Sequence, residues 1–318
     1  MDRPRDNLVI LSHIMSPRFL LAPLAVITCL LADQARPIAA GPRDAMLVTA
    51  TWLAQHVADP DLVMLHMGDP AEYAKKHIPG ARLVTRAAIS SATVPGGLNL
   101  ELPPADELKT KLEALGISDN SRIVVIFGSG WVSPATRVVL TLQAAGLGDR
   151  TSLLDGGLEA WEKAGQPVTT DVPQAKTGTL SALKMASPIV DADFVKAHLN
   201  TPKYVVIDAR DPELYTGEKT GGSPTAPHKT GHIAGAKSLP YSTTVNDDNT
   251  LKSEAELKAL FDQAGVKPGD TVVAYCHIGQ QATAVVFAAR SLGIDVKLYD
   301  GSFEDWSKKD GPVEKTIK

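Results

Sequence analysis

One cysteine of this chain lies where a nucleophile could be built. Cys276 follows the apolar run from Thr271 to Tyr275, which predicts a buried β-strand, and it precedes a short polar loop and a helix-like stretch. At such a junction the backbone N–H groups of the loop and the first turn of the helix favour an anion. A thiol held there is stabilised as its thiolate, so Cys276 is expected to act as a nucleophile without a neighbouring base.

The first forty residues differ from the rest of the chain. Arg18 precedes the apolar run from Phe19 to Ala32, and small residues extend to Ala40. This pattern is typical of a secretory signal peptide cleaved near Ala40, and Met15 is an alternative start. We therefore interpret residues 1–40 as a signal peptide and expect export to the periplasm. An uncleaved membrane anchor is disfavoured because the run is short for a spanning helix and contains a proline.

The composition is that of a globular protein. The chain has 318 residues, of which 44% are hydrophobic and 21% charged, and this length suits about two domains. A net charge of -4 gives no general attraction to nucleic acid, so any site for an anion must be local. Cleavage of the leader would remove Cys29 and leave Cys276 without a disulfide partner. The histidines show no metal-binding spacing, and we expect neither a metal nor a cofactor.

The chain repeats one α/β unit. The paired segments, in order along the two copies, are 63–70 and 205–212, 77–81 and 232–236, 107–116 and 256–265, 123–127 and 272–276, and 154–161 and 299–306. Apolar strands separated by helix-period segments predict, in each copy, a mainly parallel sheet with helices on both faces. Residues 41–168 form the first domain, residues 169–188 a linker rich in Pro, Thr, Gly and Ser, and residues 189–318 the second domain.

The two copies differ at the carboxyl ends of their strands, where chemistry is expected. Phe127 takes the place of Cys276, and 66–68 (His-Met-Gly) replaces 208–210 (Asp-Ala-Arg). The first copy is therefore the inactive one. The second copy carries an insertion from Thr216 to Gly231, which suits either a basic lid over an anionic substrate or a solvated loop.

These residues resemble the rhodanese family, and in particular its tandem-domain sulfurtransferases, in which an inactive first domain packs against an active second one. The features that carry the resemblance are the paired His-Ile-x-Gly-Ala runs, the paired Asp-Gly-Gly/Ser turns with a following Trp, the Asp-Ala-Arg turn and the six-residue loop that begins at Cys276. The resemblance implies that Cys276 accepts sulfane sulfur as a persulfide and passes it to a thiol or cyanide. It also implies a set of substrate-binding residues, which are Arg210, His277, Ile278, Gly279, Gln280 and Gln281.

The sulfur donor is predicted from the same loop. In thiosulfate-using members of the family the loop after the cysteine typically carries Arg and Lys, whereas mercaptopyruvate-using members carry Gly-Ser-Gly. His277 and Ile278 match neither pattern, and His277 is either a partial cation or a solvent-facing residue. Arg210 and the basic insertion favour thiosulfate, because a guanidinium can bind two oxygens at once. The alternative donor is 3-mercaptopyruvate.

Two other functions fit parts of the sequence. A cysteine-dependent phosphatase would need an arginine at the end of the loop, where this chain has Gln281 and then Ala282 and Thr283, so it is disfavoured. A non-catalytic exported binding module with a redox-sensitive Cys276 stays open as an alternative. Asp208 is interpreted as the structural partner of Arg210, and His232 as structural because its counterpart lies in the inactive copy.

Overall fold

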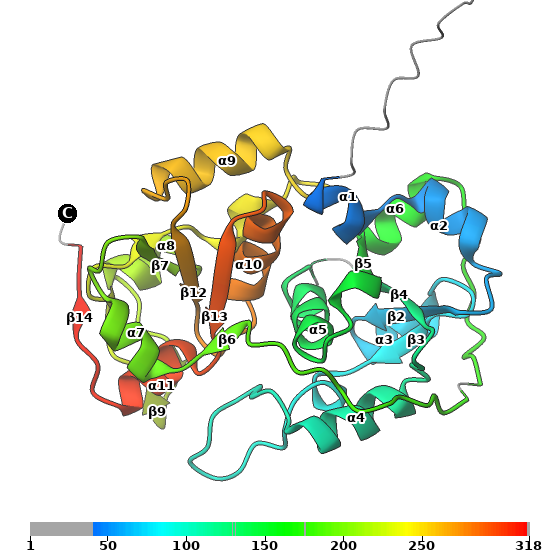
Figure 1. The fold of residues 1–318 in the computed structure, drawn as a ribbon, viewed down its shortest axis with the longest axis horizontal. Coiled ribbons are helices and arrows are strands. Elements are labelled where there is room, and N and C mark those ends of the chain that lie inside the picture. The colour runs from blue at the N-terminus through cyan, green and yellow to red at the C-terminus, as the bar shows by residue number, and fades with distance from the viewer. Residues whose placement is uncertain (1–40, 129, 131, 175, 317–318) are drawn as a thin grey trace, which may run out of the picture. The chain divides into compact units, whose positions relative to one another are not determined.

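The structure, a computed structural model, describes residues 41–316 apart from residues 129, 131 and 175 (Figure 1). The signal peptide expected in residues 1–40 lies outside the described residues. Within them, no helix is both long enough and apolar enough to pass through a lipid bilayer.

The first copy is a five-stranded parallel sheet with helices on both faces. Its strand order is β1-β5-β4-β2-β3, and every pairing is parallel. The strands are β1 (Leu47–Val48), β2 (Leu62–Met67), β3 (Arg82–Val84), β4 (Arg122–Phe127) and β5 (Thr151–Leu154). The helices are α1 (Pro42–Met46), α2 (Ala50–His56), α3 (Pro70–Lys75), α4 (Ala105–Ala114), α5 (Val132–Ala144) and α6 (Gly157–Lys163), with short 3-10 turns at Arg86–Ala88 and Gly148–Arg150.

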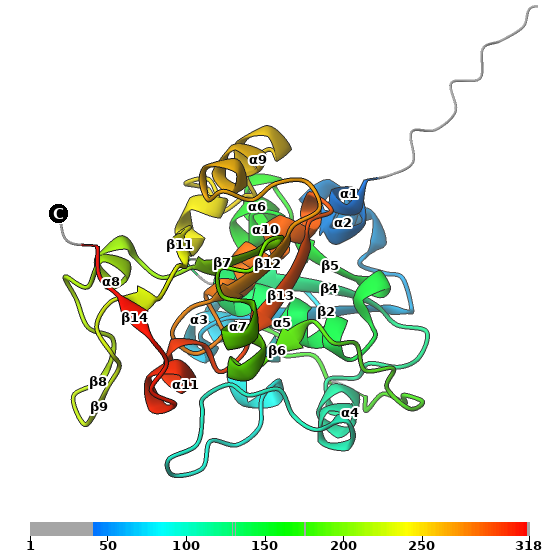
Figure 2. The ribbon, with the colours of Figure 1, turned by 60° about the vertical axis from the view of Figure 1, so that its left-hand side comes forward.

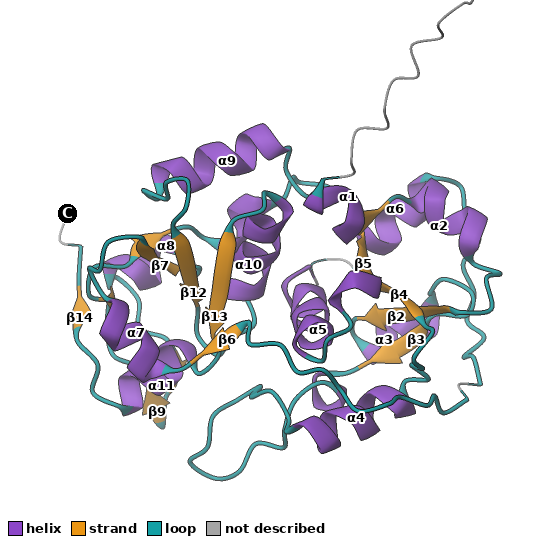
Figure 3. Ribbon diagram, in the orientation of Figure 1, coloured by secondary structure: helices purple, strands orange, loops and turns teal. Residues whose placement is uncertain are grey.

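The second copy repeats this arrangement. Its sheet has the order β11-β7-β12-β13-β6, again with parallel pairings. The strands of this sheet are β6 (Ile189–Val190), β7 (Tyr204–Asp208), β11 (Lys237–Ser238), β12 (Thr271–Tyr275) and β13 (Asp295–Tyr299). The helices are α7 (Ala192–His198), α8 (Pro212–Thr216), α9 (Glu254–Gln263), α10 (Ala282–Ser291) and α11 (Ser302–Lys308), with a 3-10 turn at Tyr241–Thr244. Figure 3 shows helices on either side of the strands in both copies.

Two small antiparallel pairs complete the second copy. In the first of them, β10 (His232–Ile233) pairs with β14 (Val313–Glu314). The insertion predicted between Thr216 and Gly231 contains the other pair, a hairpin of β8 (Gly222–Ser223) and β9 (Ala226–Pro227). In Figure 2 this hairpin extends from the end of the second copy that also carries α11. Its four strand residues are exposed, so no core packing constrains it.

The matching strand orders confirm the predicted repeat and the predicted fold class. Strand register extends the match to single residues. His66 pairs with Ile126 in the first sheet, and Asp208 pairs with Tyr275 in the second. Phe127 and Cys276 are the next residues along the two strands, so they occupy equivalent places.

The predicted linker is irregular, yet it is attached to the first copy. The N–H of Gly178 donates to the carbonyl of Glu113, and the N–H of Leu180 donates to the Glu113 side chain. Leu180 is itself buried. The linker is therefore attached to the first copy around Gly178 and Leu180, while most of its other described residues are exposed.

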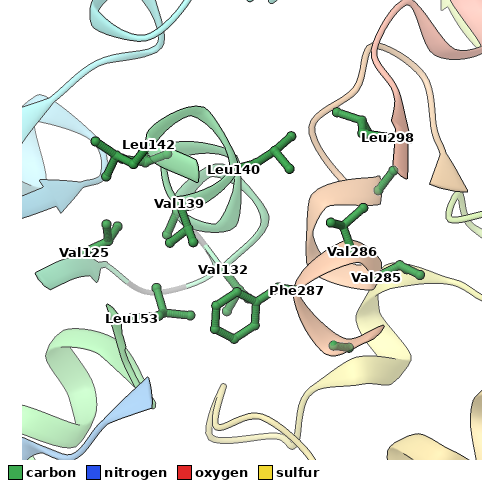
Figure 4. Packing of buried hydrophobic residues seen from close by; sticks show 14 of the residues in the cluster. Val125, Val132, Val139, Leu140, Leu142, Leu153, Val285, Val286, Phe287 and Leu298 are labelled. Atoms are coloured by element: carbon green, nitrogen blue, oxygen red, sulfur yellow. The ribbon is translucent and has the colours of Figure 1, made fainter. Parts of the chain in front are cut away.

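The largest hydrophobic cluster runs through both copies. In each copy one face of the sheet joins this cluster, through α4 and α5 in the first copy and through α9 and α10 in the second. Helices α5 and α10 contact each other, and Figure 4 shows Val132 of α5 beside Phe287 of α10. The opposite faces form two separate clusters, one around Trp161 and one around Trp306. The continuous cluster fixes the position of α5 against the start of α10, where the candidate site lies.

Candidate active site

Cys276 stands at the carboxyl end of β12, a strand with neighbours on both sides in the second sheet. The apolar residues of β12 are buried on both faces, as a central parallel strand requires. The loop from Cys276 to Gln281 then leads into α10. Gly279 has a φ of +74°, a conformation that favours glycine, and a Cβ there would lie 2.5 Å from the carbonyl oxygen of Asp300.

The start of the loop is held by the first turn of α11. The N–H of Cys276 donates to Ser302 Oγ at 3.2 Å, and that hydroxyl donates to the carbonyl of Tyr299 at 2.8 Å. The carbonyls of Cys276 and His277 accept hydrogen bonds from the N–H groups of Phe303 and Glu304, each at 3.0 Å. The backbone on either side of the thiol is therefore fixed. The Cys276 side chain is fully buried.

The rest of the loop keeps its backbone donors free. Within the described part of the chain, no protein acceptor is found for the backbone N–H groups of residues 277 to 281. Below them, α10 begins with the carbonyls of Gln280 and Gln281 accepting from Thr283 and Ala284. Free N–H groups beside a helix N-terminus form a cradle that can stabilise an anion. The side-chain oxygens of Gln280 and Gln281 are buried without a partner among the described atoms.

Arg210 is close to this loop, and its Nε and Nη2 are engaged elsewhere, whereas no protein acceptor is found for its Nη1 within the described residues. Its guanidinium donates to both carboxylate oxygens of Asp208, at 2.6 to 3.2 Å, and to the carbonyl of Gly231 at 2.7 Å. It also stacks 3.9 Å above the ring of Phe303. Arg210 and Asp208 are 1% and 0% exposed. Asp208 accepts a further hydrogen bond from the Tyr275 hydroxyl, which fits the structural role predicted for it.

A pocket of about 590 Å³ opens over the loop. Of the predicted site residues, His277 and Ile278 line it, whereas Cys276 and Arg210 do not. The other lining residues come from the first copy, the insertion and the two helices beside it: Asn99, Leu214, Gly221, Gly222, Ser223, Ala226, His228 and Glu304. The insertion therefore forms part of the wall of this pocket, and its role as a lid stays a prediction.

This pocket is not basic. Burial, assisted by the charge of Arg210 and by His228, lowers the pKa of His277 to about 4, so its ring is neutral at neutral pH. Burial also lowers the pKa of His228. Burial raises the pKa of Glu304, but hydrogen bonds from Asn99 and Lys308 outweigh it and leave that pKa below the usual value. The partial cation suggested by the sequence for His277 therefore does not form near neutral pH.

The lysines of the insertion also point elsewhere. Lys229 is ion-paired with Asp310 and donates to the carbonyl of Gly311 at 2.9 Å. Lys219 lies 3.9 Å from Glu213. Neither lysine lines the pocket, and the part of the insertion that does so is uncharged apart from the titratable His228.

His232 has the structural place that the repeat predicts. It stacks on Tyr215 with ring centroids 3.8 Å apart, and its Nδ1 lies 2.7 Å from the Tyr215 carbonyl. His77 stacks on Tyr73 in the same way in the first copy, at 3.9 Å. A pair that recurs in the copy without a thiol serves the fold rather than the reaction.

Several residues around the loop were not anticipated from the sequence. They are Ser302, which holds the Cys276 amide, Asn99 and Glu304, which share hydrogen bonds at 3.1 Å on the pocket wall, and Arg137, which reaches the loop from the first copy. Of these residues, only Arg137 could have been singled out from the sequence, because it is the one charged residue in the apolar helical stretch from Val132 to Ala144.

Comparison with known proteins identifies the repeated unit. The family model described as a Rhodanese-like domain matches residues 49–164 and again residues 191–309. A probable 3-mercaptopyruvate sulfurtransferase of Pseudomonas aeruginosa is 32% identical over 274 residues, which cover 82% of this chain and 95% of that protein. A thiosulfate sulfurtransferase of Azotobacter vinelandii is 28% identical over 275 residues, covering 85% of this chain and 97% of that protein.

Solved structures share the fold. The crystal structure of YnjE superposes with a TM-score of 0.76 at 26% identity, covering 87% of this chain and 70% of that one. An anaerobic ergothioneine biosynthesis enzyme from Chlorobium limicola superposes with a TM-score of 0.78 at 22% identity, covering 90% of this chain and 74% of that one. The second likeness concerns the fold alone.

Proposed function

Because the chain belongs to the rhodanese family, with two rhodanese-like domains in tandem as in its sulfurtransferases, we propose that it transfers sulfane sulfur from thiosulfate to a thiol or cyanide through a persulfide on Cys276. The observation that carries the proposal is the position of Cys276, between the fixed end of β12 and five free backbone N–H groups. Sulfurtransferase activity itself is supported by relatives of both kinds, one named a probable 3-mercaptopyruvate sulfurtransferase and the other a thiosulfate sulfurtransferase.

The chemistry takes place on the protein's own sulfur. The Cys276 thiolate attacks the outer sulfur of thiosulfate, the sulfur–sulfur bond of the donor breaks, and sulfite leaves with the electron pair. The loop N–H groups and the start of α10 stabilise the anionic sulfur that results. Cyanide or a thiolate then attacks the outer sulfur of the persulfide, and the Cys276 thiolate departs and is regenerated.

The donor enters through the pocket lined by His277 and Ile278. The thiol is buried, so the wall between it and the pocket must open locally for transfer. The exposed β8–β9 hairpin forms one side of this wall and is the segment whose movement would disturb the core least.

A second donor, 3-mercaptopyruvate, is favoured by one observation. The pocket is lined by no lysine or arginine among the described residues, and Arg210 is already neutralised by Asp208. A dianion such as thiosulfate gains most from uncompensated cations, whereas a monoanion depends on them less. With this donor a carbon–sulfur bond breaks, and pyruvate leaves as an enolate that takes up a proton.

Mass measurement of the intact protein tests the proposal directly. After incubation with thiosulfate or 3-mercaptopyruvate the wild-type chain is expected to gain one sulfur atom, and Cys276→Ser is expected to gain none. The ratio of kcat/KM for the two donors decides between them. If neither donor adds sulfur and cyanide yields no thiocyanate, the result would support the alternative hypothesis of a non-catalytic binding module.

We also propose that the chain is exported to the periplasm, on the basis of the apolar run and small residues before Ala40. N-terminal sequencing of the protein recovered from fractionated cells would test this. A mature protein that still begins at Met1 or Met15 would contradict it.

A further inference from the structure

Arg137 is a buried charge in the copy that has no nucleophile. It lies on α5, where nearly every side chain is buried, and is itself 1% exposed. Its guanidinium leaves the first copy and donates to the carbonyl of Gly279 at 3.0 Å, in the loop that follows Cys276. It also pairs with the carboxylate of Asp300 and donates to the carbonyl of Leu100.

These contacts enclose the middle of the loop. A Cβ on Gly279 would lie 2.5 Å from the backbone oxygen of Asp300 and 3.1 Å from Nη1 of Arg137, so this glycine is tightly packed between them. Asp300 in turn accepts a hydrogen bond from the N–H of Leu102, at 3.1 Å, from the first copy. Two groups of the first copy thus reach the turn that supports the loop.

The repeat shows that this arrangement is one-sided. Thr136 and Thr283 are equivalent residues of α5 and α10, and their hydroxyls meet at 2.7 Å. The next residue is Arg137 in the first copy and Ala284 in the second. Ala284 lies instead beside a small cavity that is also lined by Asp155, the counterpart of Asp300. At this pair of equivalent positions, the copy without the thiol supplies an arginine to the loop of the copy that has it, whereas Ala284 offers no charge in return.

We propose that Arg137 is a positioning residue for the Cys276 site, and that this is the contribution of the inactive first domain to sulfur transfer. A planar trans peptide points its C=O and N–H in opposite directions. By holding the Gly279 carbonyl, Arg137 fixes the direction of the Gln280 N–H, one of the five free donors of the cradle. The effect on turnover rests on the proposed function, whereas the effect on loop geometry does not.

Variants of the full chain separate this role from simple stability. Arg137→Met leaves Asp300 buried without its partner, so Arg137→Met is also made together with Asp300→Asn, which removes both charges. Arg137→Lys keeps the charge but loses the forked geometry. The matched control is Gln143→Ala, because Gln143 of α5 accepts a hydrogen bond from Arg290 of α10 at the same contact between copies but away from the loop.

Three measurements are made on each variant: melting temperature, kcat and KM with thiosulfate and with 3-mercaptopyruvate, and the pH dependence of iodoacetamide alkylation at Cys276, located by peptide mass. We expect folded Arg137→Met and its double variant to lose about 100-fold in kcat, as for a misplacement of about 1 Å, and to need higher pH for the same alkylation rate. Arg137→Lys should recover part of both losses, and Gln143→Ala should match the wild type in both.

A folded double variant with wild-type kcat and an unchanged alkylation profile would overturn the proposal. So would equal losses of kcat in Gln143→Ala, since the effect would then belong to the contact between copies in general. If the wild-type chain transfers no sulfur from either donor, the proposed function fails, while the alkylation profiles still decide whether Arg137 positions the loop.

Discussion

At the scale of single residues, the electrostatic surroundings of the thiol depend on which nearby charged side chains are already paired with other residues. Arg210 is committed to Asp208, Lys229 to Asp310, and His277 is neutral near pH 7. Within the described residues, what remains for an anion is the row of backbone N–H groups after Cys276 and the Nη1 of Arg210, for which no protein acceptor is found. The site therefore relies on oriented peptide dipoles more than on side-chain charge.

Replacing Arg210 tests whether its first role is structural. Arg210→Met leaves the Asp208 carboxylate buried and unpaired, so we expect a loss of about 3 to 5 kcal/mol in unfolding free energy by chemical denaturation. Adding Asp208→Asn removes the stranded charge and should restore part of that loss. Wild-type stability in Arg210→Met, with only a higher KM for thiosulfate, would instead support the substrate-binding role predicted from the sequence.

Acid should destabilise the fold through its buried neutral histidines. Burial lowers the pKa of His66 to about 4, from 6.5 for a free side chain, so the unfolded state binds more protons between these two values. The stability that neutral His66 contributes is present above pH 6.5 and is lost as the pH falls toward 4, to the extent of about 3 kcal/mol. Unfolding free energies measured at several pH values should fall less steeply in His66→Leu. An unchanged slope would contradict this origin.

At the scale of elements, the site is assembled from one strand, one loop and the first turns of two helices. β12 delivers Cys276, α11 holds the carbonyls of the first two loop residues, and α10 provides the N-terminus behind the loop. The β8–β9 hairpin differs from these elements because it is exposed and packs into no core. It is thus the part of the site free to change without unfolding the rest.

Shortening the hairpin tests its role as a wall of the pocket. Replacing residues 223–226 with two glycines removes two lining residues, Ser223 and Ala226, and should change stability by no more than about 0.5 kcal/mol. We expect a several-fold higher KM for the donor with the melting temperature preserved. A wild-type KM for both donors would show that the hairpin does not help to enclose the substrate.

At the scale of the whole described molecule, the two copies share one hydrophobic cluster through α5 and α10. Hydrogen bonds also join the copies at both ends of the helix pair, through Thr136 and Thr283 and through Gln143 and Arg290. We therefore regard the first copy as part of the support of the candidate site rather than as an independent domain.

Phe287→Ala tests this shared core. Phe287 is 3% exposed and lines a space together with Val132 of the first copy, so its truncation should cost about 3 to 5 kcal/mol. Fluorescence is measured in two variants, one with Trp161 and one with Trp306 as its sole tryptophan, so that each reports one copy. Both signals should show coincident denaturation at a lower midpoint. A transition of the second copy alone would indicate that the copies unfold independently.

Local patterns determined much about this protein. The duplicated strands and helices, the loss of the thiol at Phe127 and the strand-loop-helix around Cys276 were readable because periodicity and turn chemistry act over a few neighbouring residues. Strand order and register then agreed with the repeat, because similar patterns of apolar strands and helices pack into the same sheet arrangement in both copies.

Only the tertiary structure decided which polar and charged groups lie in contact. Arg137 and Gly279 are 142 residues apart, and Asn99 and Glu304 are 205 apart, so no local pattern connects them. Arg210 was recognisable as a cation beside the site, but whether it is free depends on its burial against Asp208 and Phe303. Residue types and spacing specify the groups that chemistry requires, whereas their electrostatic state depends on desolvation and on partners brought together by packing.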